Sequence, residues 1–121
     1  MNPRILKFGA AWCGPCRALK PLLDKWAKEK GLEIEVVSLD KPGGLETSEK
    51  YNVQAVPTVL FVDDKGKELA SVMGYGAETM ALLDEALRTA QMRLVRRESR
   101  NIRRENVKRV AKAKATKEPK S

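Results

Sequence analysis

Histidine is absent from the sequence, cysteine occurs only twice, and charged residues break up every apolar run. No window approaches the ~18 consecutive apolar residues that a membrane span needs. The N-terminal residues do not show the charged segment, apolar run and small-residue cleavage site of an export signal. These absences predict a soluble, cytoplasmic protein without a membrane span.

Length and charge predict one domain followed by a basic extension. A chain of 121 residues is long enough for one domain with a core but short for two. The net charge of +8 is unevenly distributed, because residues 88–121 carry 13 basic and 3 acidic side chains, a net +10. Residues 1–87 carry a net −2. We therefore expect a domain over residues 1–87 and a basic extension over residues 88–121.

The apolar periodicities predict four strands and three helices. Because a crossover helix makes the first two strands parallel and a hairpin makes the last two antiparallel, the sheet should be mixed and packed by helices. The expected fold is α/β with the order β-α-β-α-β-β-α. In chain order we expect a strand over 4–9, a helix over 14–31, a strand over 33–40, a helix over 45–51, strands over 57–64 and 67–74, and a helix from about 77.

Two of these helices have a clear apolar face. Apolar residues recur at three-to-four spacing, which places them on one side of a helix. We expect these faces to contain Leu19, Leu22, Leu23, Trp26 and Ala27 on the first helix, and Leu82, Leu83, Ala86 and Leu87 on the last.

The two cysteines, Cys13 and Cys16, lie three residues apart where the first strand meets the first helix. A structural crosslink is disfavoured, because the closed loop is tiny and a reducing compartment would open it. A zinc site would need two more soft ligands, and without histidine or a third cysteine it would require a dimer or carboxylates. We therefore predict redox chemistry and no metal.

The position of Cys13 favours a reactive thiolate. Unpaired backbone N–H groups and the helix dipole stabilise an anion at a helix N-terminus and lower a thiol pKa. Cys16, one turn later, is expected beneath Cys13 and less exposed, where it can attack a mixed disulfide formed at Cys13. Gly14 and Pro15 shape this first turn, and Pro15 occupies a position that donates no intrahelical hydrogen bond.

The motif WCGPC after a strand, joined 41 residues later by VPT, resembles the thioredoxin family over about residues 4–87. The resemblance implies a minimal thioredoxin-like fold that lacks the family's usual first strand and helix, so that one sheet face is thinly covered. It also implies a monomeric protein-disulfide reductase, active in electron transport and cell redox homeostasis. Its substrates would be protein disulfides, and a thioredoxin reductase or a related donor would recharge it. No cofactor is implied beyond the Cys13–Cys16 disulfide.

The resemblance also assigns the site residues. Cys13 becomes the attacking cysteine and Cys16 the resolving one. Pro57 becomes a cis-proline that faces the cysteines and leaves the Val56 backbone free to pair with a bound peptide. The alternative is an ordinary trans proline at the start of an edge strand. The implied substrate-binding residues are Trp12, Gly14, Pro15, Val56, Pro57, Met73 and Gly74, most of which would form a small apolar docking face.

One position departs from the family pattern. The family places a buried acid six residues before the attacking cysteine, and this sequence has Lys7 there, while the family's partner lysine aligns with Val36. The positive charge of Lys7, or its neutral amine if burial lowers its pKa, would favour a nearby thiolate. The alternative is that Lys7 extends to solvent and has no role in the site.

The sequence after Leu87 predicts a continued helix with a frayed or disordered end. Its cations could bind nucleic acid through phosphates, but the absence of aromatic residues from this extension disfavours base stacking. An acidic protein, a membrane surface or a merely solvated helix are alternatives. The alternative function is a nucleic-acid or polymerase-accessory binding subunit on a thioredoxin scaffold. The candidate contacts are Arg96, Arg97, Arg100, Arg103, Arg104, Lys108, Arg109 and Lys112.

Overall fold

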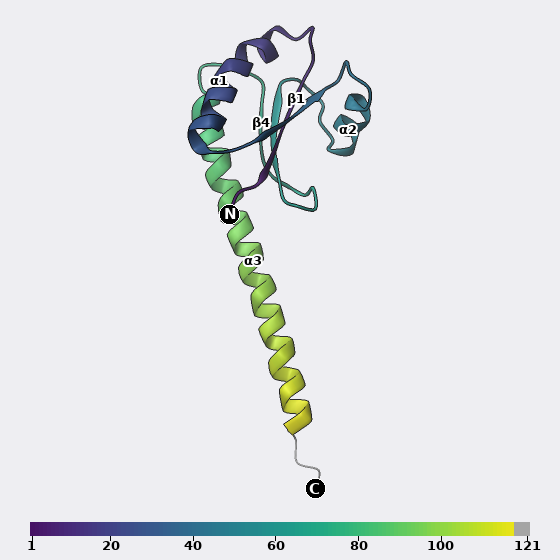
Figure 1. The fold of residues 1–121 in the computed structure, drawn as a ribbon, viewed down its shortest axis with the longest axis vertical. Coiled ribbons are helices and arrows are strands. Elements are labelled where there is room, and N and C mark those ends of the chain that lie inside the picture. The colour runs from purple at the N-terminus through teal and green to yellow at the C-terminus, as the bar shows by residue number, and fades with distance from the viewer. Residues whose placement is uncertain (118–121) are drawn as a thin grey trace.

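The computed structural model describes the backbone of residues 1–117 and the side chains of residues 1–112. A four-stranded sheet with three helices forms a domain from which the last helix projects (Figure 1). The predicted element order is confirmed. The elements are β1 (Arg4–Gly9), α1 (Gly14–Lys30), β2 (Ile34–Ser38), α2 (Gly44–Lys50), β3 (Thr58–Val62), β4 (Glu68–Met73) and α3 (Thr79–Lys117).

The sheet is mixed, as predicted, with the strand order β2-β1-β3-β4. Strand β1 runs parallel to β2 and antiparallel to β3, and β3 and β4 form the antiparallel hairpin. Lys7 in β1 lies opposite Val36 in β2 and Val59 in β3. The central position of β1 places the cysteine motif, which follows it, at the middle of one sheet edge.

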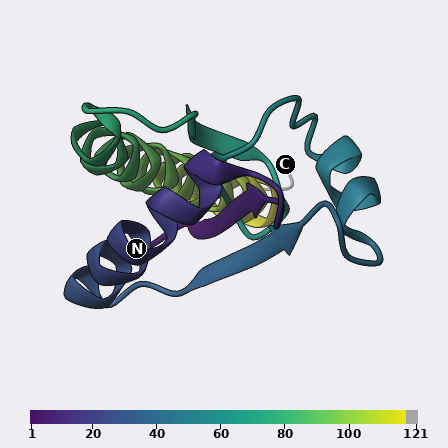
Figure 2. The same cartoon turned by 90° about the horizontal axis from the view of Figure 1, so that it is seen from above.

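The side chains of β1 alternate between two separate cores. Ile5 packs with residues of α1 and α3, whereas Leu6 and Phe8 pack on the other side, where Tyr51 follows α2. Seen from above, α2 lies apart from α1 and α3 (Figure 2). Both sides of β1 are buried. Cover is thinner at edge strand β2, where Val36 is exposed.

The apolar faces of the helices differ from the prediction at two positions. Leu22 and Leu82 are exposed, whereas their neighbours Leu23 and Leu83 are fully buried. Consecutive residues point about 100° apart around a helix, so a residue at the edge of the apolar face can be exposed while the next one is buried. The buried stripe of α3 also continues past Leu87 to Ala90.

Helix α3 crosses the predicted boundary at residue 87 without a break. Asp84 accepts a hydrogen bond from the Trp26 indole at 2.8 Å, and the Arg97 guanidinium contacts Asp63 beyond β3. Past these contacts α3 projects away from the domain (Figure 1). The predicted disordered end falls on residues 118–121, outside the described residues. In the described part of the chain, no helix has the length and apolar character to span a membrane.

Candidate active site

Cys13 and Cys16 form a disulfide at the junction of β1 and α1, with their Cα atoms 5.3 Å apart. Cys13 is the N-cap of α1, and its Sγ accepts a hydrogen bond from the Cys16 backbone N–H at 3.2 Å. A first-turn N–H that already points at this sulfur would also stabilise a thiolate there. Local helix geometry therefore supports the nucleophilic role predicted for Cys13.

The two cysteines are equally buried in the disulfide. Cys13 is 5% exposed and Cys16 is 4% exposed, so the predicted difference in accessibility is not present in this state. The disulfide draws both sulfurs together, and the side chains of Ala10, Leu39 and Val56 pack around them. Any difference in access must therefore arise in the reduced protein.

Three residues that the sequence reasoning did not single out shape the floor of the site. A Cβ on Gly9 would lie 3.4 Å from both Cβ and Sγ of Cys16, so a glycine leaves room for that side chain. Leu39 packs against the cysteines, and Asp40 accepts a hydrogen bond from the Ala11 N–H at 3.2 Å. Leu39 and Asp40 directly follow β2, which runs parallel to β1. The predicted parallel pairing of β1 and β2 could have identified Leu39 and Asp40, because parallel strands end at the same sheet edge.

The Val56–Pro57 peptide bond is cis, as the resemblance implied. Val56 packs against the cysteines, which brings this loop to the disulfide. The Gly74 N–H donates to the Pro57 carbonyl at 2.8 Å, so the segment containing Met73 lies beside the same loop. Hydrogen bonding and packing thus bring together three segments that are distant in sequence.

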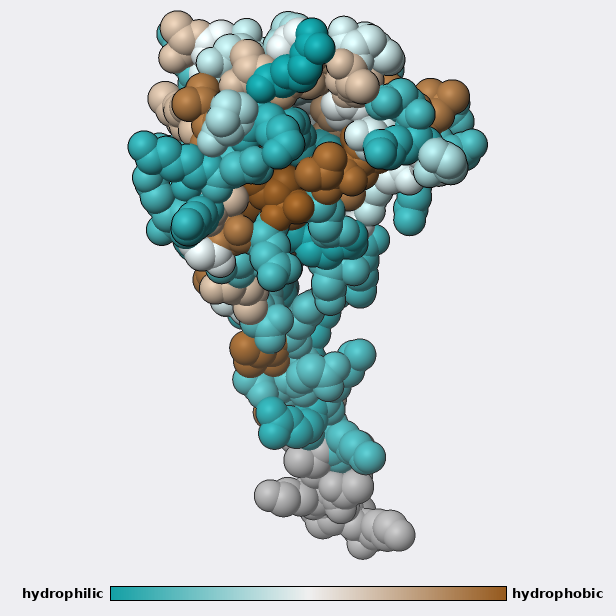
Figure 3. Space-filling view, turned by 45° about the horizontal axis from the view of Figure 1, so that its top comes forward, coloured by the Kyte–Doolittle hydropathy of each residue, from teal (hydrophilic) through white to brown (hydrophobic). Residues whose placement is uncertain are grey.

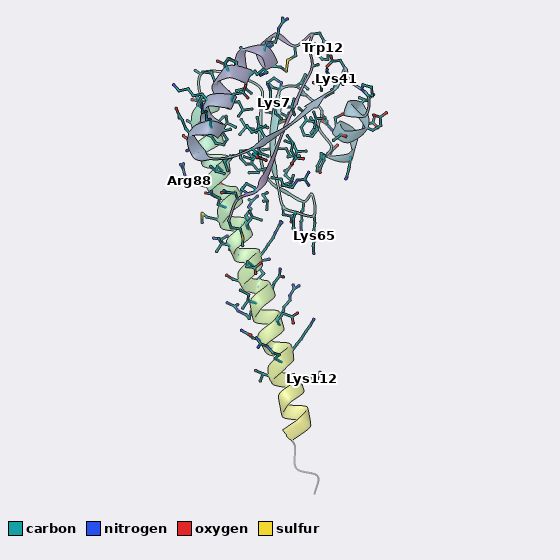
Figure 4. The ribbon with its side chains drawn as sticks, in the orientation of Figure 1. Lys7, Trp12, Lys41, Lys65, Arg88 and Lys112 are labelled. Atoms are coloured by element: carbon teal, nitrogen blue, oxygen red, sulfur yellow. A yellow bond between two sulfur atoms is a disulfide. The ribbon has the colours of Figure 1, made fainter. Side chains whose placement is uncertain are left out.

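Of the seven residues named for substrate binding, four are exposed, whereas Pro57 is buried and Val56 and Gly74 are partly buried. Trp12 and Met73 are each 70% exposed, and Gly14 and Pro15 are exposed as well. Trp12 lies at the end of the domain opposite the projecting helix (Figure 4). Exposed apolar side chains beside a buried disulfide are suited to contacting a partner. Their role as a docking face stays a prediction.

Lys7 is buried beneath the first turn of α1. Lys7, labelled in Figure 4, is only 7% exposed. Its Nζ donates a hydrogen bond to the Cys16 carbonyl oxygen at 3.4 Å. Burial lowers the pKa of Lys7, with the Asp24 charge acting in the opposite direction. The alternative that Lys7 extends to solvent is therefore wrong.

The remaining predicted residues, the cations of the extension, lie on α3 and not at the disulfide. Arg97 contacts Asp63, and Arg109 donates to Asn106 at 2.6 Å. Among the described residues, no group of three or more histidine, cysteine, aspartate or glutamate side chains is placed to hold a metal ion.

Comparison with known proteins gives a consistent result. The family model for Thioredoxin matches residues 1–88. The chain is 35% identical over 71 residues to the thioredoxin of Listeria monocytogenes, covering 59% of this chain and 68% of the relative. It is 39% identical over 73 residues to the chloroplastic M-type thioredoxin of Pisum sativum, covering 60% of this chain but only 42% of that protein.

Solved structures support the same relationship. The structure of Fasciola hepatica thioredoxin matches with a TM-score of 0.60 at 34% identity, covering 73% of this chain and 83% of that one. Oxidised thioredoxin O2 of Arabidopsis thaliana matches with a TM-score of 0.61 at 31% identity, covering 71% and 75% of the two chains. With its WCGPC motif and its Cys13–Cys16 disulfide, this chain belongs to the thioredoxin family of thiol–disulfide oxidoreductases.

Proposed function

We propose that the protein reduces protein disulfides by cycling Cys13 and Cys16 between dithiol and disulfide. One observation carries this proposal: the disulfide lies at the N-terminus of α1, packed against the loop of cis-Pro57. The helix end supplies an environment that favours a thiolate, and the loop offers backbone and apolar surface to a peptide. Proteins of this family act on protein disulfides and are reduced by thioredoxin reductase. We also propose that the protein is a monomer, that it works in the cytoplasm, and that a thioredoxin reductase or a related donor reduces it.

The reaction begins with the Cys13 thiolate. It attacks one sulfur of a substrate disulfide, a mixed disulfide forms at Cys13, and the first substrate thiolate leaves. Cys16 then loses its proton and attacks the Cys13 sulfur, which forms the Cys13–Cys16 disulfide and releases the second substrate thiolate. The substrate gains two electrons and two protons. A reductase must return the same number to the protein without any further cofactor in this chain.

Substrate binding in this proposal uses exposed and partly exposed residues around the cysteines. The Val56 backbone would pair with an extended peptide, and the side chains of Trp12 and Met73 would contact the residues that flank its disulfide. Gly14, Pro15 and Gly74 would allow close approach because they present little side chain.

Reduction of insulin driven by dithiothreitol tests the proposal. The wild-type protein should accelerate precipitation of the insulin B chain, and Cys13→Ser should not. Equal rates for the two proteins would reject the enzymatic role.

A second candidate function, nucleic-acid binding, is favoured by how charge is arranged on α3. With 3.6 residues per turn, six of the eight candidate cations fall within an arc of about 140°. Glu98 and Glu105 lie on the other side, and the projecting helix is mostly hydrophilic on the face shown in Figure 3. A one-sided cationic helix fits a row of phosphates. The six residues are Arg96, Arg97, Arg100, Arg103, Arg104 and Lys108.

Fluorescence anisotropy with a short DNA duplex tests this second function. Affinity should fall steeply between about 50 and 200 mM salt and depend little on sequence. Reversing charge on the cationic face with Arg100→Glu and Arg103→Glu should weaken binding far more than Arg109→Glu, which lies outside the arc. Absence of binding at low salt, or equal effects of the variants, would reject it. An acidic protein partner would then be the next candidate.

A further inference from the structure

A groove of about 640 Å³ lies where helix α3 leaves the domain. One wall is formed by the β3–β4 turn and the start of β1, and the other by residues between 94 and 104 of α3. Figure 4 shows Lys65, in the turn, at the end of the domain from which α3 projects, opposite Trp12. The groove is therefore separate from the disulfide site.

The lining of this groove is polar and mainly cationic. Eleven of its thirteen residues are polar, which suits a charged chain better than an apolar ligand. Six of the side chains are cationic and three are acidic, and one of the acids, Asp63, already contacts Arg97. The six cations are Arg4, Lys65, Lys67, Arg97, Arg100 and Arg104.

Four of these cations are available to a ligand. They are exposed, and within residues 1–112 they form no ion pair with an acidic side chain. The acids Asp64 and Glu98 also line the groove and offset only part of this charge. Like charges that two elements bring together repel one another, and an anion bound between them relieves that repulsion. The four are Lys65 and Lys67 on the turn and Arg100 and Arg104 on α3.

The α3 wall is part of the cationic face described above for this helix. Arg97, Arg100 and Arg104 all belong to the arc of about 140°. From Arg97 to Arg104 the helix rises about 10 Å, roughly three phosphate intervals of one B-DNA strand measured along its axis. Lys65 and Lys67 line the same groove from the other wall. A strand that follows the arc toward the domain therefore meets a second set of cations.

We propose that this groove holds the phosphate backbone of a nucleic acid, with Lys65 and Lys67 of the β3–β4 turn as contacts alongside the α3 cations. This inference rests on the second function proposed above, nucleic-acid binding, and adds a surface of the redox domain to it. The contacts go to phosphate oxygens and read no sequence. Nucleic acid bound there lies at the end of the domain opposite Trp12 and leaves the disulfide accessible to a substrate.

Anisotropy titrations with a short DNA duplex over about 50–200 mM salt test the groove. Each lysine–phosphate contact contributes about 0.9 to the slope of log K against log salt, so the double variant Lys65→Gln, Lys67→Gln should have a slope shallower by about 1.8. The control, Lys28→Gln with Lys41→Gln, removes two exposed lysines outside the groove and should keep the wild-type slope. Lys41 lies at the end of the domain that carries Trp12 (Figure 4).

Acetylation of the wild-type protein gives a second measurement that needs no variant. With saturating duplex, Lys65 and Lys67 should be protected from acetylation, whereas Lys28 and Lys41 should stay reactive. An unchanged slope in the turn variant, or acetylation of the turn lysines that the duplex does not slow, would overturn the inference and leave α3 alone as the site. A wild-type protein that does not bind the duplex at low salt would instead reject the nucleic-acid function on which the inference rests.

Discussion

Asp63 joins the β3–β4 turn to helix α3 through Arg97. The Arg97 guanidinium contacts the Asp63 carboxylate, which also accepts the backbone N–H groups of Lys65 at 2.9 Å and Lys67 at 2.8 Å. Burial acts to raise the pKa of Asp63, but the two backbone donors and the Arg97 charge outweigh it and hold the pKa below its usual value. One carboxylate thus closes the hairpin turn and anchors the base of the projecting helix.

Asp63→Ala should lower the free energy of unfolding by about 1–3 kcal/mol, because two turn N–H groups and Arg97 lose their acceptor. Urea denaturation followed by circular dichroism measures the change. Asp64→Ala, at the exposed neighbouring position, is the matched control and should stay within about 0.5 kcal/mol of wild type. Equal effects of the two substitutions would show that the Asp63 contacts do not stabilise the fold.

The same carboxylate predicts a pH dependence of stability. Because the pKa of Asp63 is lower in the folded protein, its contribution is fully present above the unfolded-state pKa and is lost as pH falls through the folded-state pKa. The difference in unfolding free energy between wild type and Asp63→Ala should therefore shrink on acidification below about pH 4. A difference that grows at low pH would contradict this assignment.

Gly44→Ala should destabilise the protein by about 1–3 kcal/mol through steric conflict at the start of α2. A Cβ there would overlap the Ser38 carbonyl oxygen and lie 2.6 Å from its carbon, both backbone atoms. Gly76→Ala is the control, since a Cβ at Gly76 meets nothing within 4 Å. Thermal unfolding of both variants should show a lower midpoint for Gly44→Ala alone. Similar midpoints would mean that the turn adjusts freely.

Shortening the chain should separate the anchored part of α3 from the projecting part. Removing residues 93–121 deletes Leu94, which packs on the core. It also deletes Arg93, which donates to the Leu69 carbonyl, and Arg97, which contacts Asp63. This truncation should lower stability. Removing residues 100–121 leaves those contacts, so urea midpoints and insulin reduction should match the full chain. Equal stability of the two truncations would show that these contacts contribute nothing.

In the reduced protein, Cys13 should react with iodoacetamide before Cys16. The N-cap position of Cys13 stabilises a thiolate, and the Cys16 side chain fills the space above Gly9. Peptide mapping after partial alkylation measures the order. Earlier modification of Cys16 would reverse the assigned roles.

The sequence predicted the element order, the mixed sheet and the cis-Pro57, because periodicity and two specific motifs determine them. It did not distinguish Leu22 from Leu23, or Leu82 from Leu83, because the exact angle at which a helix lies on a sheet is a tertiary property. The equal burial of the cysteines also could not be read from the chain, since Leu39 and Val56 come from distant segments.

The position of Lys7 illustrates the same limit. Its alternation with Leu6 and Phe8 placed it on the opposite side of the strand, but a lysine side chain is long enough either to reach water or to end in the interior. Only the cover that α1 provides decides between them.

Likewise, the charge of the extension was evident from composition, whereas the anchoring of Arg97 depended on the position of the β3–β4 turn.

Trapping of a substrate on Cys16→Ser tests the central claim most directly, because this variant should start the exchange but cannot resolve it. Reduced Cys16→Ser is incubated with insulin whose disulfides are intact. It should accumulate a covalent adduct, which mass spectrometry locates at Cys13 and dithiothreitol removes. Wild type should release its substrate, and Cys13→Ser should form no comparable adduct. Absence of an adduct on Cys13 in Cys16→Ser would contradict the account.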